Sequence, residues 1–150
     1  MWHALFSVVN VIAFIGWVLL IAFPRKPLTH SAILYLCVAL LCLVYAVTLT
    51  LVMSGTVDPA AIPGAGETGF GSIEGVRAIF QSDGGVVIGW THYLAFDLFT
   101  GMWIGRDGDH KGFSRWIQAP FLVLTYLFGP VGLFSWLIIR ERRARLTGRG

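Results

Sequence analysis

Four apolar runs, each about as long as a bilayer is thick, constrain this chain more than any other feature. They cover residues 2–23, 31–53, 86–104 and 117–139. A transmembrane helix needs about 20 predominantly apolar residues, because the hydrocarbon core is ~30 Å thick and each residue adds ~1.5 Å. Only 13% of the residues are charged, about half the usual share in soluble domains. We therefore predict an all-α fold, a single integral membrane four-helix bundle that occupies residues 1–150.

One long connection, residues 54–85, separates the second run from the third. Its first half is rich in glycine and proline and cannot sustain a helix. Its second half contains SIEGVRAIF, in which Ile73, Val76 and Phe80 recur at helical spacing after Ser72, a weak capping residue. We predict a short helix here that lies on the membrane surface.

The basic residues favour a membrane partner but leave the orientation open. Five arginines in the tail, residues 140–150, follow directly after an apolar run, which is typical of an anchor for anionic lipid head groups. No folded basic domain or recognition motif accompanies them, so nucleic-acid binding is not expected. In a four-span chain the tail and Arg77 would lie on one face and the other loop cations on the opposite face: Arg25, Lys26, Arg106, Lys111 and Arg115. The two faces would therefore carry nearly equal numbers of basic residues, so the positive charges do not fix the orientation.

Asp97 lies within the third run and makes the insertion of that run into lipid less favourable. A central aspartate costs about 2.5 to 3.5 kcal/mol on the insertion scale. The eight Leu, Ile, Phe and Val residues of that run together contribute only roughly 2.5 to 5 kcal/mol. Asp97 should therefore face the bundle interior, paired or protonated, and an ionisable residue in a span is a functional hypothesis by default.

Helical spacing suggests which residues accompany Asp97. Tyr93 lies four residues earlier and shares its face with Trp90, whereas His92 lies one residue round, on the face of Phe96. We predict that Asp97 hydrogen-bonds a residue of another helix, with three candidates: His3, Asn10 and Gln118. The polar residues of the first and fourth runs, Thr125 among them, have interhelical hydrogen bonding as their alternative role.

Small residues predict where the helices approach one another. Glycine at an interface lets two backbones come close in a membrane. We expect the third and fourth runs to approach most closely through four glycines and to enclose a polar cavity: Gly85, Gly89, Gly129 and Gly132. Gly101 is a further packing position of the third run. Pro130 is expected to kink the fourth helix, because it lacks the backbone N–H that the helix needs.

No metal or catalytic motif is evident. The four histidines, His3, His30, His92 and His110, occur singly, without the paired helical spacing that a di-iron site uses. We therefore expect no metal.

Two segments carry a family resemblance. GWTHYLAFDLFTGMWI, residues 89–104, followed by LTYLFGPVGLFSWLIIR, residues 124–140, resembles the best-marked parts of the neoxanthin synthase family, plant plastid proteins linked to abscisic acid deficiency with many bacterial relatives. Nine residues match the family pattern: His92, Asp97, Leu98, Phe99, Gly101, Trp103, Gly129, Pro130 and Gly132. No plastid transit peptide precedes the first run, which favours a bacterial member in the inner membrane.

The resemblance implies a substrate class and a chemistry. Plant members of the family turn an epoxy-carotenoid into its allenic isomer, which needs an acid and a base but no redox cofactor or metal. Asp97, His92 and Tyr93 are then the candidate catalytic residues. Candidates for lining a polyene site are Trp90, Phe96, Trp103, Asn10, His3, Gln118 and Thr125.

Two other functions remain open from the sequence. The first is a non-catalytic protein that binds a carotenoid or organises pigment-synthesis enzymes, with Asp97 as a structural hydrogen-bonding residue. The second is a transporter in which Asp97 relays protons; its four short helices would have to form a homo-oligomer to build a path.

Overall fold

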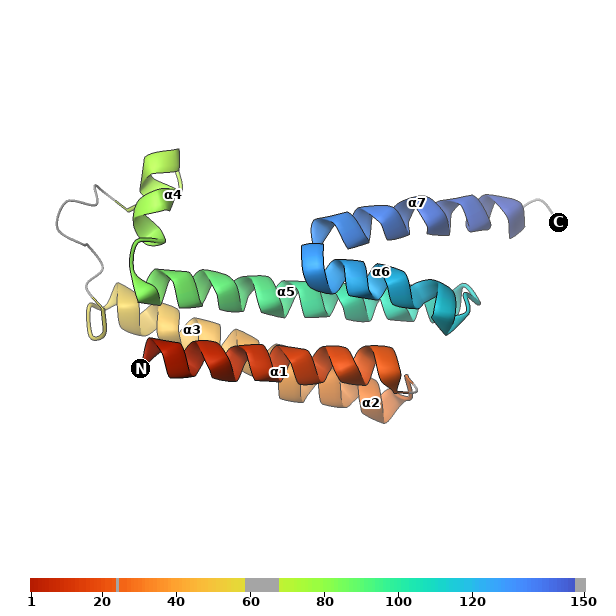
Figure 1. Ribbon diagram of the computed structural model, residues 1–150, viewed down its shortest axis with the longest axis horizontal. Coiled ribbons are helices and arrows are strands. Elements are labelled where there is room, and N and C mark those ends of the chain that lie inside the picture. Colours follow the sequence, from red (N-terminus) through yellow and green to blue (C-terminus); the bar gives the residue numbers. More distant parts are fainter. Residues whose placement is uncertain (24, 59–67, 148–150) are drawn as a thin grey trace.

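The computed structural model describes residues 1–23, 25–58 and 68–147, with side chains as far as Glu141. Every regular element in these ranges is helical, which confirms the all-α prediction (Figure 1). In chain order the elements are α1 (Trp2–Ala22), α2 (Pro27–Ala32), the π-helix η1 (Ile33–Val38), α3 (Ala39–Met53), α4 (Ile73–Ile79), α5 (Asp83–His110), α6 (Arg115–Phe128) and α7 (Pro130–Thr147).

The first two apolar runs form the two helical segments that are long and apolar enough to cross a membrane. They are α1, with 21 residues, and the continuous segment Pro27–Met53, with 27 residues, in which α2, η1 and α3 follow without a break. The second segment starts earlier than predicted because Pro27 occupies its first turn, where a missing N–H is not needed. Length and composition of both segments are consistent with a membrane protein.

Helix α5 lies along the full length of α1 and also packs against the η1 and α3 parts of the second segment. Near its start, a Cβ on Gly84 would lie 3.0 Å from the Trp2 ring and 3.3 Å from Val52. Near its end, a Cβ on Gly105 would lie 3.3 Å from Nε of Arg25, just beyond α1. The stretch between these two glycines is therefore as long as α1, about 30 Å. The third apolar run is part of this longer helix, which continues to His110.

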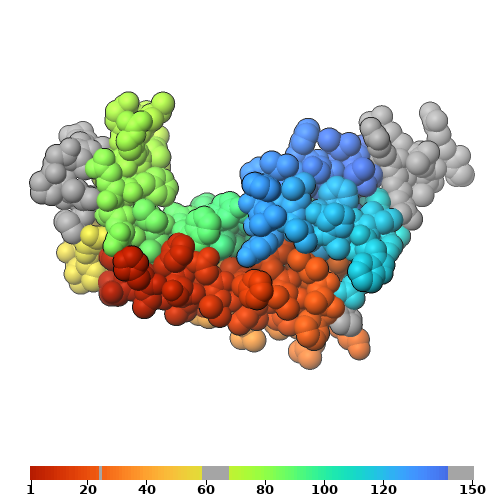
Figure 2. Space-filling model, in the orientation of Figure 1, coloured from red at the N-terminus to blue at the C-terminus, as the bar shows by residue number. Residues whose placement is uncertain are grey.

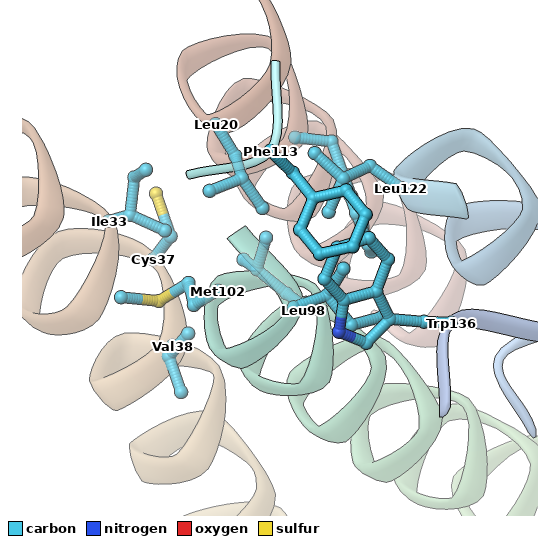
Figure 3. Packing of buried hydrophobic residues seen from close by; sticks show 11 residues of the cluster. Leu20, Ile33, Cys37, Val38, Leu98, Met102, Phe113, Leu122 and Trp136 are labelled. Carbon is cyan, nitrogen blue, oxygen red and sulfur yellow. The ribbon is translucent and has the colours of Figure 1, made fainter. Parts of the chain in front are cut away.

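Buried apolar side chains from five helical segments form the main core at the C-terminal end of α5. Leu98 and Met102 of α5 lie at its centre, between Leu20 of α1 and the Ile33 to Val38 turn of η1 (Figure 3). On the other side, Leu122 of α6 and Trp136 of α7 complete the cluster, and both are fully buried. Close packing of this kind associates helices even in lipid, where apolar burial alone gives no preference.

The fourth apolar run does not form one span, so that prediction is wrong. Residues 117–139 belong to two helices, and α7 runs back along α6 instead of continuing it (Figure 1). The register against α5 shows the reversal: Gln118 lies beside Gly108, Gly129 beside Asp97, and Arg140 bonds Asp107. The α6–α7 hairpin therefore enters beside α5 only to about its middle and returns.

Because of this hairpin, the start of α1 and the end of α7 lie at opposite ends of the molecule (Figure 1). A four-span chain would have brought both termini to the same side. The residues at the turn permit this reversal, because Gly129 takes a positive φ of 20°, which ends α6, and Pro130 begins α7 without needing an N–H partner.

The short helix predicted in the long connection is present as α4. Its N-cap is Ser72, whose Oγ accepts a hydrogen bond from the Gly75 N–H at 3.0 Å, as the sequence indicated. Figure 1 shows that the axis of α4 is steeply inclined to the axis of α5. Residues 59–67 of the same connection lie outside the described residues.

Candidate functional site

Asp97 lies where the tip of the α6–α7 hairpin meets the middle of α5. A Cβ added to Gly129 would lie 2.8 Å from Cγ of Asp97, so the carboxyl group rests directly on the bare backbone of the tip. One carboxyl oxygen, Oδ2, is buried and has no hydrogen-bond partner among the described residues. Asp97 thus faces protein, as predicted, and keeps an oxygen free for a further interaction.

The tip is held in this position by packing within the hairpin. Gly132 sits so close to α6 that its Cβ would lie 2.5 Å from Cα of Thr125. The fully buried Thr125 hydroxyl donates to the Phe121 carbonyl at 2.7 Å and therefore stays within α6. Gly129 and Gly132 thus close the hairpin and bring it to Asp97. Pro130 starts α7 and does not kink a continuous helix, which corrects the prediction for this residue.

Tyr93 is the polar neighbour of Asp97 on the same helix. Its side chain interacts with the Asp97 carboxyl group, and its hydroxyl lies 3.4 Å from the Leu127 carbonyl near the tip of the hairpin. The predicted partners from other helices, His3, Asn10 and Gln118, do not contact Asp97, so that prediction is wrong.

An aromatic ladder leads from α1 to this pair. The Tyr93 ring stacks on Trp90 with centroids 5.2 Å apart, and Trp90 stacks on Phe6 at 5.9 Å. Asn10 fixes the ladder, because its Oδ1 accepts a hydrogen bond from Trp90 Nε1 at 3.1 Å. Asn10 and Trp90 are therefore joined to Asp97 through Tyr93.

The surface is hollowed between α4 and the α6–α7 hairpin, with α5 as its floor and α1 along one side (Figure 2). Gly89 marks one edge, because its Cβ would lie 2.9 Å from Cζ of Phe80, just after α4. Asp97 marks the other edge, against the hairpin tip. Tyr93 lies between them on the same side of α5, since the three residues are spaced by four. We call this hollow the Asp97 recess.

His92 lies away from the Asp97 recess. Its ring stacks on Phe96 at 4.7 Å and lies 5.5 Å from the Tyr45 ring of α3. His92 and Asp97 are five residues apart, which turns their side chains about 140° from each other on a helix. The predicted acid, Asp97, and the predicted base, His92, therefore do not lie together in one site.

An apolar groove of about 500 Å³ runs along the side of α5 to which Phe96 points. Phe96 is 59% exposed and lies in the groove wall with Phe99 and Ala95. The opposite wall comes from the second membrane segment: Leu34, Tyr35, Val38, Ala39 and Cys42. Phe96 and the ring of His92 stacked on it thus belong to a second surface of the helix.

Three other predicted glycines pack against α1 and α4. Gly85 and Gly89 meet Ile79 and Phe80 at the end of α4, where a Gly85 Cβ would lie 2.9 Å from the Ile79 carbonyl carbon. A Cβ added to Gly101 would lie 2.6 Å from Cζ3 of the Trp17 ring in α1. Gly85 and Gly89 therefore do not bring α5 to the fourth run, which corrects that prediction, whereas Gly129 does contact α5.

The remaining candidates for lining a polyene site have other surroundings. His3 borders a small hollow with Trp2, Phe6 and Asp83 at the N-terminal end of the molecule. Trp103 lies under the guanidinium group of Arg140, 5.5 Å from the ring centroid, at the far end.

Gln118 belongs to a buried polar network that the sequence did not reveal. Arg25, whose side chain is only 3% exposed, donates to Gln118 Oε1, to the Gly105 carbonyl at 3.2 Å and to Asp109 at 2.7 Å. Gln118 in turn donates to Asp109 and to the Phe113 carbonyl, both at 2.9 Å. The network ties the α1–α2 turn to α5 and α6. In the sequence, Arg25 and Asp109 lie in predicted loops between apolar runs, and no periodic pattern connects them.

A second ionic contact holds α7 against α5. Arg140 makes two hydrogen bonds to the Asp107 carboxylate, at 2.7 and 2.9 Å, and Trp136 Nε1 donates to it at 3.0 Å. Burial by itself would raise the pKa of Asp107, but the hydrogen bonds from Arg140 and Trp136 and the charge of Lys111 outweigh it and lower that pKa below its usual value. The contact is therefore strongest with Asp107 ionised.

Replacing Arg140 with glutamine is expected to loosen the hairpin by about 1 to 3 kcal/mol at neutral pH, the usual contribution of hydrogen bonds to charged groups. Because the pKa of Asp107 is lower in the folded protein, ionised Asp107 stabilises the fold at pH values above the ordinary Asp pKa of about 4, and this stabilisation is lost as the pH falls below that value.

Tryptophan fluorescence during thermal unfolding in detergent measures both effects. The native protein should lose stability below about pH 4, and Arg140→Gln should lose less. Arg106→Gln removes an equal charge from an exposed position and serves as the control. Equal stability of the two variants would contradict this role.

One known protein family matches the chain over most of the helices described above. A family model described as ABA DEFICIENT 4-like matches residues 4–136, which include α1 through the first part of α7. No curated protein and no solved structure matches the chain. The family match covers most of the chain, so the protein belongs to the ABA DEFICIENT 4-like family, as the resemblance to neoxanthin synthase indicated.

Proposed function

We propose that this member of the ABA DEFICIENT 4-like family is an integral membrane protein that binds a carotenoid or related isoprenoid lipid and isomerises it by acid/base chemistry at Asp97. The observation that carries the proposal is the position of Asp97 at the edge of the recess. There the carboxyl group, beside Tyr93, keeps one buried oxygen that has no hydrogen-bond partner in the part of the chain that the structure describes. A buried polar atom left unpaired is costly unless a ligand or a reaction uses it.

The surroundings suit a long apolar substrate. Trp90 and Tyr93 present stacked rings next to Asp97, and the recess opens on the outer surface of the molecule (Figure 2). A lipid-soluble polyene would reach it from the membrane without crossing water. Aromatic faces bury large areas and favour offset stacking, which fits a conjugated chain.

The reaction can be balanced with Asp97 as the only proton carrier. No cation pairs with Asp97 among the described residues, so the carboxyl group is assigned its neutral form. It donates its proton to an epoxide oxygen as the C–O bond breaks. The resulting carboxylate takes a vinylic proton as the new double bond of the allene forms. The substrate keeps its atoms and electrons, Asp97 regains its proton, and Tyr93 orients the carboxyl group.

This proposal gives Tyr93 the place next to Asp97 that the sequence suggested for His92. His92 lies on the other side of α5, so it would contact the polyene at most from the groove lined by Phe96. The isomerisation itself follows the chemistry of the family resemblance, whereas Asp97 and Tyr93 are assigned by position.

A second candidate function is binding without turnover. The separation of His92 from Asp97 favours it, because the two groups of the predicted acid/base pair lie on different sides of α5 and do not face one binding site. In this case Asp97 would hold a pigment hydroxyl or epoxide through Oδ2, and the protein would store the pigment or present it to enzymes.

One experiment separates the two functions. Membranes that contain the protein are incubated with an epoxy-carotenoid such as violaxanthin, without added nicotinamide, flavin or metal, and the pigments are extracted and separated by chromatography. An isomer of unchanged mass that appears only with the native chain supports catalysis. Unchanged pigment that copurifies with the protein supports binding alone. Neither conversion nor copurification would contradict both.

A further inference from the structure

Basic residues gather at one end of the molecule. Arg25 reaches Gly105 and Asp109, and Arg115 donates to the Ile21 carbonyl at 3.1 Å, so the α1–α2 turn and the α5–α6 connection lie together. Arg140 of α7 bonds Asp107 at this same end. Six cations of the described side chains therefore lie here: Arg25, Lys26, Arg106, Lys111, Arg115 and Arg140. Helix α7 continues outward with three more arginines in its sequence, at positions 142, 143 and 145. We call this the basic end.

The opposite end has a different charge. Among the described residues, Arg77 is its single arginine or lysine, and it is accompanied by three carboxylates, Asp58, Glu74 and Asp83. Trp2, at the start of α1, lies beside Gly84 and therefore belongs to this end as well. The asymmetry results from the α6–α7 hairpin. A fourth span would have carried the tail arginines to the end of Arg77.

Lysine and arginine near the ends of membrane helices are retained on the cytoplasmic side, and nearby acidic residues have little influence on this choice. The cytoplasmic leaflet is also rich in anionic lipids, each nearby lysine or arginine contributing about 1 kcal/mol of attraction. The basic end therefore fits the head groups of that leaflet.

The Asp97 recess lies toward the other leaflet. Gly84 and Gly105 are level with the two ends of α1, and Asp97 lies about 12 Å from the level of Gly105 at ~1.5 Å per residue. The hairpin fills the part of this side of α5 beyond Asp97, toward the basic end. Gly89 and Tyr93 lie before Asp97, in the half that belongs to the N-terminal end.

From this arrangement we infer that the basic end lies at the cytoplasmic face, that the N-terminus lies at the opposite face, and that the Asp97 recess opens into the leaflet away from the cytoplasm. The inference about substrate entry rests on the proposed function, because it assumes that the recess takes the lipid. The orientation itself depends only on the helices and the charges. An apolar substrate would then enter from the non-cytoplasmic leaflet, and the basic end would anchor the protein in the other.

Cysteine labelling in intact cells tests the orientation without any pigment. Three variants are made in a Cys42→Ser background, in which the remaining Cys37 is buried. Gly71→Cys reports the N-terminal end, where a new side chain meets nothing within 4 Å. His110→Cys, at an exposed position, reports the basic end, and Thr147→Cys reports the end of α7. Each is expressed in a bacterial host and treated with a membrane-impermeant maleimide before and after permeabilisation.

Gly71→Cys should be labelled in intact cells, and His110→Cys and Thr147→Cys only after permeabilisation, with at least a tenfold difference in labelling. The reverse pattern, or equal labelling of all three, would overturn the orientation. Labelling of Thr147→Cys together with Gly71→Cys would overturn the hairpin on which the charge distribution depends. Since no outcome involves carotenoid conversion, failure of the orientation remains distinct from failure of the proposed function.

Discussion

Replacing Asp97 with asparagine is expected to lower conversion of an epoxy-carotenoid by about 10² to 10⁴-fold, the usual contribution of a positioned general acid or base. The amide has nearly the same shape as the carboxyl group and can still lie against Gly129, one helical turn from Tyr93. It cannot donate an acidic proton to the epoxide and then take one back. The fold should therefore remain while the chemistry is lost.

Two measurements on three variants distinguish catalysis from structure at this position. Conversion and copurified pigment are compared in Asp97→Asn, in Tyr93→Phe and in Asp83→Asn, a control that changes an exposed carboxylate of the same helix. Tyr93→Phe should retain part of the activity, because it removes only the hydroxyl that orients Asp97. Retained pigment with lost conversion in Asp97→Asn is the expected result. Full conversion by Asp97→Asn would exclude the proposed acid/base role.

Replacing Gly129 with leucine should cause the largest loss of stability. The side chain would collide with the Asp97 carboxyl group, 2.8 Å from its Cβ, at a residue whose φ of +20° already disfavours any side chain. Overpacking costs about 1 to 3 kcal/mol, and a strained backbone conformation adds about 1 to 3 kcal/mol. For a chain of this size each kcal/mol corresponds to about 2 to 4 °C, so a total cost of about 2 to 6 kcal/mol should lower the melting temperature by roughly 4 to 24 °C.

Thermal unfolding in detergent, followed by circular dichroism, measures this loss. Gly71→Leu is the matched control, because nothing lies within 4 Å of its new Cβ, and it should leave the melting temperature unchanged. Gly89→Leu should have a smaller effect than Gly129→Leu, since it meets the far end of the Phe80 ring, which can move. A melting temperature for Gly129→Leu equal to that of the Gly71 control would show that the tip does not hold Asp97.

The sequence by itself determined that the fold is all-helical, located the first two apolar helices and α4, and indicated that Asp97 faces protein. Apolar runs of bilayer length permit few structures other than helices in lipid, because every backbone N–H and C=O must be satisfied within the segment. Ser72 and the spacing of Ile73, Val76 and Phe80 were enough to locate α4. The insertion cost of a carboxylate was enough to predict that Asp97 faces protein.

The partners of Asp97 were not accessible from helical spacing. Spacing shows which residues share a face of one helix, and it identified Tyr93 correctly as a neighbour. It does not show which other helix covers that face or at what height. His3, Asn10 and Gln118 were reasonable partners by polarity, but each found a different place when the helices packed.

Only the tertiary structure decided between a kinked span and a hairpin at residues 129 and 130. Gly-Pro is compatible with both, since the local sequence fixes the missing N–H and the permitted φ but not the direction of the following helix. The direction comes from contacts distant in sequence: Gly132 against Thr125, and Arg140 and Trp136 on Asp107. These contacts return α7 to the end from which α6 came. The same reversal brings Gly129 to Asp97 and gathers the arginines at one end, because one turn sets the position of every residue that follows it.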